Sequence, residues 1–70
     1  MPDERNVDQL TARELEVLKL LGRGLANREV ADGLGVSSRT VEAHLRSIYS
    51  KLGVRTRSAA TRYAIEHGLA

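Results

Sequence analysis

The stretch NREVADGLGVSSRTVEAHLRSIYSKL, residues 27–52, predicts two helices joined by a short turn. In its second half, apolar residues recur at the 3.6-residue spacing of a helix, at Val41, Leu45, Ile48 and Leu52. Ser37 or Ser38 is suited to cap the start of this helix, and Gly53 follows its end. The pattern therefore predicts a helix over about residues 38–52 that buries one narrow stripe.

The first half of the same stretch predicts a shorter helix, over about residues 28–34, with Asn27 as its N-cap. Ala31 is small where two helices must approach closely, Gly35 suits a left-handed turn, and Val41 can pack back onto the short helix. This combination is typical of a helix-turn-helix, whose second helix can enter the DNA major groove. An ordinary helical corner uses the same residue types and stays open as an alternative.

The flanking segments predict two more helices. TARE at residues 11–14 fits a capping box for a first helix, which Gly22 and Gly24 are expected to stop, and Thr56 or Ser58 is expected to cap the last helix. No alternating run of β-branched residues predicts a strand. We therefore expect an all-α domain of four helices, over about residues 12–22, 28–34, 38–52 and 57–67.

Length and composition limit the other possibilities. Seventy residues make one domain at most, and we place it at residues 10–70, after a flexible lead-in or linker remnant at residues 1–9. The chain has no cysteine and only two isolated histidines, so we predict no metal site, no cofactor and no catalytic residues. No apolar run approaches the roughly 20 residues of a membrane span, so a cytoplasmic location is the default expectation.

Charge is distributed unevenly along the chain. Residues 1–35 carry a net charge of −2 and residues 36–70 a net charge of +4. A positive second half favours nucleic acid or an acidic surface as the partner, although a solvated helix face would have the same composition.

Three segments carry a resemblance to a known family: LTARELEVL, GLANREVADGLGVS and TVEAHLRSIYSKLGV. They resemble the DNA-binding domain of LuxR-type (NarL/FixJ, GerE-like) bacterial transcription regulators, over residues 10–69. The resemblance implies a four-helix domain that binds DNA as a dimer, with its third helix in the major groove and its fourth helix at the dimer interface. It also implies a larger regulator in which another module controls this domain.

The outer face of the predicted third helix carries side chains that suit base recognition. Arginine can donate two hydrogen bonds to guanine, glutamate can accept from cytosine N4, and a methyl group can pack on the thymine methyl. The predicted base-reading residues are Arg39, Glu42, Ala43 and Arg46. Pairing of Glu42 with either arginine on a solvated helix is the alternative.

Polar and basic residues at helix ends are the candidates for phosphate contacts, because helix N-termini and cations attract anions. The predicted phosphate contacts are Asn27, Arg28, Ser38, Thr40, Ser50, Lys51, Arg55 and Arg57. Each basic residue among them could equally be solvated surface.

The fourth helix is expected to hold the dimer contact through Ala60, Thr61, Tyr63 and Ala64. Its small residues would let a partner helix approach closely, and Tyr63 adds contact area. Packing of the same alanines inside the domain is the alternative. Thr61 departs from the resemblance, because an apolar residue is more usual there, so we expect a weak homodimer. Gly33 also departs from it and should cost about 1 kcal/mol relative to alanine.

Together with these residues, the resemblance implies sequence-specific binding of double-stranded DNA by a bacterial transcription regulator, as a dimer on an inverted-repeat site, with RNA polymerase as a further candidate partner. A module that docks on an acidic protein surface is the alternative from another class. A promoter-recognising segment of a sigma factor shares the helix-turn-helix but not the TVEAH…KLGV pattern.

Overall fold

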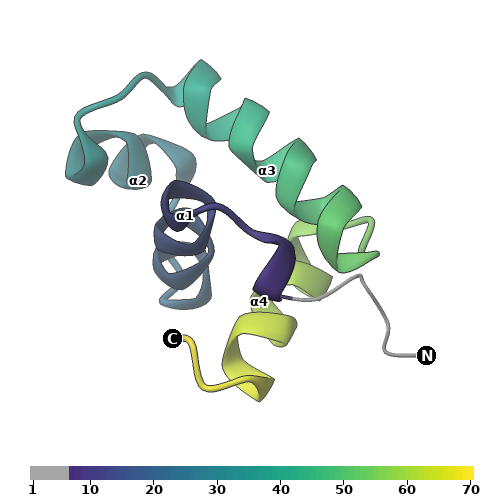
Figure 1. The fold of residues 1–70 in the computed structure, drawn as a ribbon. Coiled ribbons are helices and arrows are strands. Elements are labelled where there is room, and N and C mark those ends of the chain that lie inside the picture. Colours follow the sequence, from purple (N-terminus) through teal and green to yellow (C-terminus); the bar gives the residue numbers. More distant parts are fainter. Residues whose placement is uncertain (1–6) are drawn as a thin grey trace.

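The computed structural model describes residues 7–70, and within that range it contains four α-helices, one short 3-10 turn and no strand (Figure 1). The elements are η1 (Val7–Gln9), α1 (Ala12–Gly22), α2 (Asn27–Leu34), α3 (Ser38–Leu52) and α4 (Arg57–Glu66). The predicted all-α fold is confirmed. The predicted helix bounds differ from these by one residue at the start of α2 and one at the end of α4.

Three helices begin with a hydroxyl cap, because a side-chain oxygen there can accept one of the backbone N–H groups that lack a partner in the helix. At α1 the predicted capping box forms: Thr11 Oγ1 accepts from the Glu14 amide at 3.1 Å, and Glu14 Oε1 accepts from the Thr11 amide at 2.8 Å. Ser37 caps α3 and Thr56 caps α4, each accepting at 3.1 Å from the amide three residues later.

The start of α2 differs from the prediction. Its N-cap is Ala26, and Asn27, which we expected to be the cap, is the first helical residue. Alanine has no side-chain acceptor, so the only side-chain bond of this cap is the one in which Glu29 Oε1 accepts from the Ala26 amide at 2.9 Å. The side-chain oxygen of Asn27 accepts from Arg57 instead, at 2.6 Å.

Glycine is needed at two positions of the fold, for a different structural reason at each. Gly35 ends α2 with φ of 69°, the left-handed conformation that was predicted for it. Gly22 is the last helical residue of α1, as the predicted bounds of this helix require. A Cβ atom there would lie 2.8 Å from the Cβ atom of Ala64, so this glycine lets α1 and α4 approach closely.

The core is built around α1, which contacts the other three helices, while α3 lies across the outside of the domain (Figure 1). Eleven buried apolar side chains form one cluster: Val17, Leu18, Leu21, Val30, Ala31, Val41, Leu45, Ile48, Leu52, Ala60 and Ala64. α3 is thus seated on the core through its predicted stripe, and its opposite face is left free.

Residues 7–9, which we had assigned to the lead-in, form the turn η1, and the Val7 amide donates to the Tyr63 hydroxyl at 3.1 Å. The turn is therefore attached to α4. The rest of the predicted lead-in, residues 1–6, lies outside the described residues.

Candidate nucleic-acid interface

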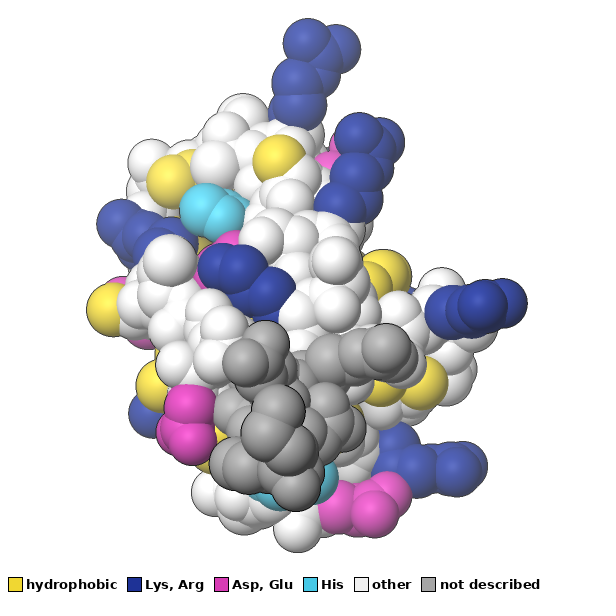
Figure 2. Space-filling view, turned by 45° about the vertical axis from the view of Figure 1, so that its right-hand side comes forward, with side chains coloured by type: hydrophobic (Ala, Val, Ile, Leu, Met, Phe, Trp, Pro, Cys, Tyr) yellow, Lys and Arg dark blue, Asp and Glu magenta, His cyan; other side chains and the backbone are white. Residues whose placement is uncertain are grey.

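The outer face of α3 is a continuous polar surface. Val41 and Ile48 on its inner face are fully buried, whereas all four predicted base-reading residues are exposed: Arg39, Glu42, Ala43 and Arg46. Extended Lys and Arg side chains project from the upper part of the molecule in Figure 2, at the height that α3 occupies in Figure 1. The structure therefore brings these four residues together on one face, as a helix of 3.6 residues per turn requires.

The polar residues at the two ends of α3 differ in how far they are available for a phosphate contact. Ser38 and Ser50 are exposed, and Thr40 is half-buried. The Thr40 amide already donates to the Ser37 hydroxyl, and the two hydroxyl oxygens lie 3.0 Å apart. The Thr40 amide is therefore used by the cap, and only its hydroxyl is left as a donor to a phosphate.

Two of the predicted phosphate contacts, Arg28 and Arg55, are exposed cations. Within residues 7–70 neither forms an ion pair, and the same holds for Arg39 and Arg46. Their charges are therefore available to a polyanion.

Lys51, another predicted phosphate contact, is engaged inside the domain. Its ammonium nitrogen donates to Glu14 Oε1 at 2.7 Å, and Glu14 is only 4% exposed. Burial raises the pKa of Glu14, but hydrogen bonds from Lys51, Ser47 and the Thr11 amide outweigh burial and lower it to about 2. A buried carboxylate needs such a partner, so Lys51 joins α3 to α1 through this ion pair, and its contact with a phosphate stays a prediction.

Arg57 is engaged as well. Its guanidinium donates to Asn27 Oδ1 at 2.6 Å and to the Leu25 carbonyl oxygen. Both acceptors lie at the start of α2, so Arg57 ties α4 to the helix-turn-helix while its side chain remains exposed. Its direct contact with a phosphate stays a prediction.

The predicted dimer residues of α4 point largely inward. Ala60 and Ala64 are fully buried in the domain and have no surface left for a partner helix. Tyr63 is half-buried; its ring stacks on His67 with centroids 3.8 Å apart, and its hydroxyl accepts from Val7. The alternative reading of the alanines, packing within the domain, is therefore the correct one, and among the predicted dimer residues only Thr61 borders an open surface.

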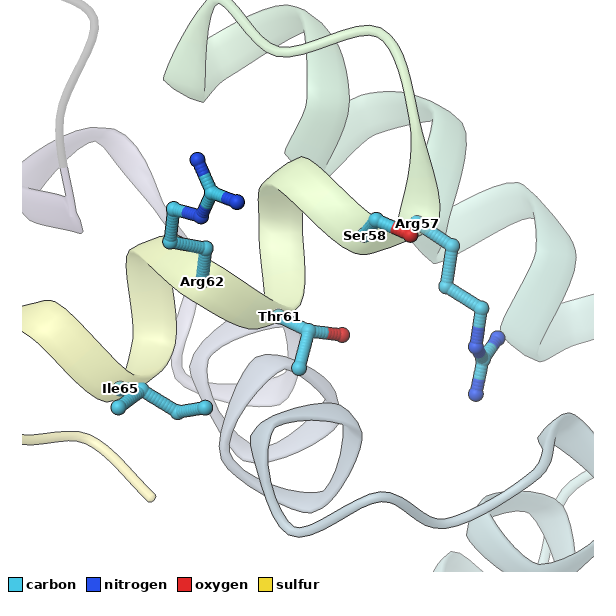
Figure 3. A pocket seen from close by; sticks show the side chains of 5 residues that line it. All are labelled: Arg57, Ser58, Thr61, Arg62 and Ile65. Atoms are coloured by element: carbon cyan, nitrogen blue, oxygen red, sulfur yellow. The ribbon is translucent and has the colours of Figure 1, made fainter.

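An open groove of about 470 Å³ lies along the outer side of α4 (Figure 3). Ile65 in this groove is 59% exposed, more than any other large hydrophobic residue of the described chain. The groove is lined by Arg57, Ser58, Thr61, Arg62 and Ile65. Sequence reasoning missed Ser58, Arg62 and Ile65, although Ser58 and Ile65 lie three and four residues from Thr61, and Arg62 lies four from Ser58 and three from Ile65, spacings that place residues on one helix face.

Two other features are absent from residues 7–70. No group of His, Cys, Asp or Glu is arranged to hold a metal ion. No helix there is long and apolar enough to cross a bilayer.

Comparison with known proteins identifies the family to which this chain belongs. Residues 8–64 match the model of the family described as "Bacterial regulatory proteins, luxR family". The chain belongs to this family. Since its members are regulatory proteins, we assign no enzymatic activity to this luxR-family domain.

Named relatives agree with this assignment. The chain is 45% identical over 69 residues to the transcriptional regulatory protein YdfI of Bacillus subtilis (strain 168), covering 99% of the chain and 32% of the relative. It is 40% identical over 62 residues to the response regulator protein VraR of Staphylococcus aureus (strain NCTC 8325 / PS 47), covering 89% and 30%. The chain thus spans about a third of the length of these relatives.

A solved structure shows the same fold. The chain superposes on the crystal structure of the response regulator ChrA from a heme-sensing two-component system with a TM-score of 0.78 and 44% sequence identity. The match covers all of this chain and 33% of that one.

Proposed function

We propose that this luxR-family domain reads double-stranded DNA by inserting α3 into the major groove, as the output domain of a larger, signal-responsive transcription regulator. The observation that carries the proposal is the outer face of α3, where two arginines without an ion pair among residues 7–70, a glutamate and a methyl group are exposed together while the inner face is buried. These are side-chain types that discriminate base edges. The small share of its relatives that the chain covers supports its role as one domain of a larger protein.

The phosphate backbone is held, in this proposal, by donors at both ends of the helix-turn-helix. They are Asn27, Arg28, Ser38, the Thr40 hydroxyl, Ser50 and Arg55, all of which have at least part of their surface exposed. Such contacts position the domain without reading sequence. DNA binding places the protein in the cytoplasm, where it would also meet RNA polymerase.

Two copies are proposed to pair through the outer side of α4 on an inverted repeat. The supporting observation is Ile65, which is exposed beside Thr61 in the α4 groove (Figure 3). The contact offered by one short helix is small, and contacts of that size form weak complexes. We therefore expect the dimer to form mainly on DNA.

Selection of a binding site from a random DNA pool tests the proposal. The wild type should enrich an inverted repeat, and Arg46→Ala and Glu42→Ala should each relax the choice of base at particular positions, with a loss of about 1–3 kcal/mol per lost base contact. Arg23→Ala and Glu16→Ala remove the same charges from exposed positions outside α3 and should leave the motif unchanged.

The same selection experiment can also contradict the proposal. Weak binding with no enriched motif, indifferent to Arg46→Ala and Glu42→Ala, would contradict DNA reading by α3. It would favour a module that docks on an acidic protein surface.

A further inference from the structure

We propose that Arg57 is a positioning residue for the DNA interface: it orients the side-chain amide of Asn27 so that the amide nitrogen faces a DNA phosphate at the start of α2. The inference rests on the proposed DNA binding and adds to it a residue that acts without touching DNA.

The guanidinium of Arg57 spans two elements that are far apart in the sequence. One of its nitrogens donates to Asn27 Oδ1 at 2.6 Å, and the other donates to the Leu25 carbonyl oxygen, 30 and 32 residues away respectively. In Figure 3 the side chain of Arg57 leaves the first turn of α4 and extends away from the direction taken by Arg62. Because the guanidinium is planar and rigid, two bonds fix both the loop before α2 and the first side chain of α2.

The orientation of the Asn27 amide follows from the chemistry of its partner. A guanidinium has donors and no acceptor, so Asn27 must turn its oxygen toward Arg57. The amide nitrogen then points away with two N–H groups, and the structure of residues 7–70 gives it no acceptor. Without Arg57, rotation of the amide would present oxygen, which repels a phosphate, as often as nitrogen.

The surroundings suit an anion. Because Ala26 has no side-chain acceptor, no side chain caps the first amides of α2, and the positive end of the helix dipole lies there with the exposed cation Arg28. Glu29 is the nearby acid, and its carboxylate is bound to the Ala26 amide. Asn27 thus adds two oriented N–H donors to a region that already favours negative charge.

A salt titration distinguishes this role from a direct phosphate contact. DNA affinity is measured by fluorescence anisotropy on the selected duplex at several salt concentrations for wild type, Arg57→Ala and Arg55→Ala. Each phosphate neutralised by a cation contributes about 0.9 to the slope of log affinity against log salt. Arg57→Ala should weaken binding severalfold and leave the slope unchanged, whereas Arg55→Ala, the exposed control, should lower the slope by about 0.9.

A double-mutant cycle tests the link between the two residues. Asn27→Ala should weaken binding by about tenfold, the size of one lost hydrogen bond to a charged group, and Arg57→Ala should weaken it severalfold. In the Asn27→Ala background, Arg57→Ala should cost less than about twofold more. If Arg57 acted instead through the α4 dimer contact, the two substitutions would be independent, and the double variant would lose DNA affinity by the product of the two single losses.

Asn27→Asp separates positioning from structural support, and it keeps the test valid if Arg57→Ala does not fold. Aspartate still accepts from Arg57, so the melting temperature should be maintained, but it has no N–H to donate and DNA affinity should fall at least tenfold. Wild-type affinity in Asn27→Asp, independent effects in the cycle, or a slope lowered by about 0.9 in Arg57→Ala would each overturn the inference. Failure of the wild type to bind any duplex with a steep salt slope would instead overturn the proposed DNA binding itself.

Discussion

At the scale of single residues, the polar side chains that stabilise the domain must be distinguished from those that are free to bind. Lys51 lies in the last turn of α3 and Arg55 three residues after its end, and their local sequence does not separate these two basic residues. Lys51 is bound to Glu14, 37 residues away, while Arg55 is exposed and has no ion pair among residues 7–70. Burial of Glu14 accounts for the difference, because a buried carboxylate requires a charged or hydrogen-bonding partner.

This pair predicts an acid-sensitive stability. The pKa of Glu14 is lowered from 4.5 to about 2 in the folded chain, so the folded state binds this proton less tightly than the unfolded chain does. The resulting stabilisation, about 3 kcal/mol, is present above about pH 4.5 and is lost as the pH falls toward 2. Glu14→Gln should therefore lower the free energy of unfolding at pH 7 by about 2 kcal/mol, and its difference from wild type should shrink below pH 4.5.

Urea unfolding at pH 7 and at pH 3 measures this difference. Glu16→Gln is the matched control, because Glu16 is exposed and only 3.7 Å from exposed Arg13, and surface pairs of this kind contribute little. A Glu14→Gln effect that stays constant between the two pH values would contradict an ionised, Lys51-paired Glu14.

At the scale of helices, two glycines should respond to alanine in opposite directions. Gly33 lies within α2 with open space around its Cβ position, and its φ is not positive, so alanine should raise stability by about 0.5–1 kcal/mol. Gly22 faces Ala64 so closely that an added Cβ would lie 2.8 Å away, and alanine there should cost about 1–3 kcal/mol. The two changes have the same chemistry, so each serves as the control of the other.

Thermal unfolding reports both changes. A shift of 1 kcal/mol corresponds to about 4–8 °C for a domain of this size. Equal shifts of the same sign in the two variants would show that intrinsic helix preference, and not the contact between α1 and α4, governs Gly22.

At the scale of the whole molecule, the outer side of α4 decides how two copies would meet. Ile65→Glu should weaken binding to the full inverted repeat by about tenfold through lost dimer contact, while leaving a single half-site unaffected. The domain's own stability should change by no more than about 0.5 kcal/mol, because this side chain is 59% exposed. Glu66→Ala, next along the helix and outside the groove, is the control.

Anisotropy titrations on duplexes with one and two half-sites, with sedimentation of the protein–DNA complex, measure the effect. An equal loss on both duplexes would show that Ile65 contributes to DNA contact or folding and would reject its role between subunits.

The sequence by itself determined the four helices, the capping box of α1 and the two faces of α3. These features depend on neighbours within about four residues, such as the bonds between Thr11 and Glu14 or the recurrence of Val41 and Leu45, so they can be read along the chain. The exposed face that we propose to read DNA was predictable for the same reason.

Only the tertiary structure decided which of the predicted contacts are already occupied. Lys51 and Arg57 find acceptors 37 and 30 residues away, and Ala60 and Ala64 are covered by the other helices of the same domain. Local sequence cannot show such pairings, because they depend on how α1, α2 and α4 pack together and on the cost of burying a charge or polar group without a partner.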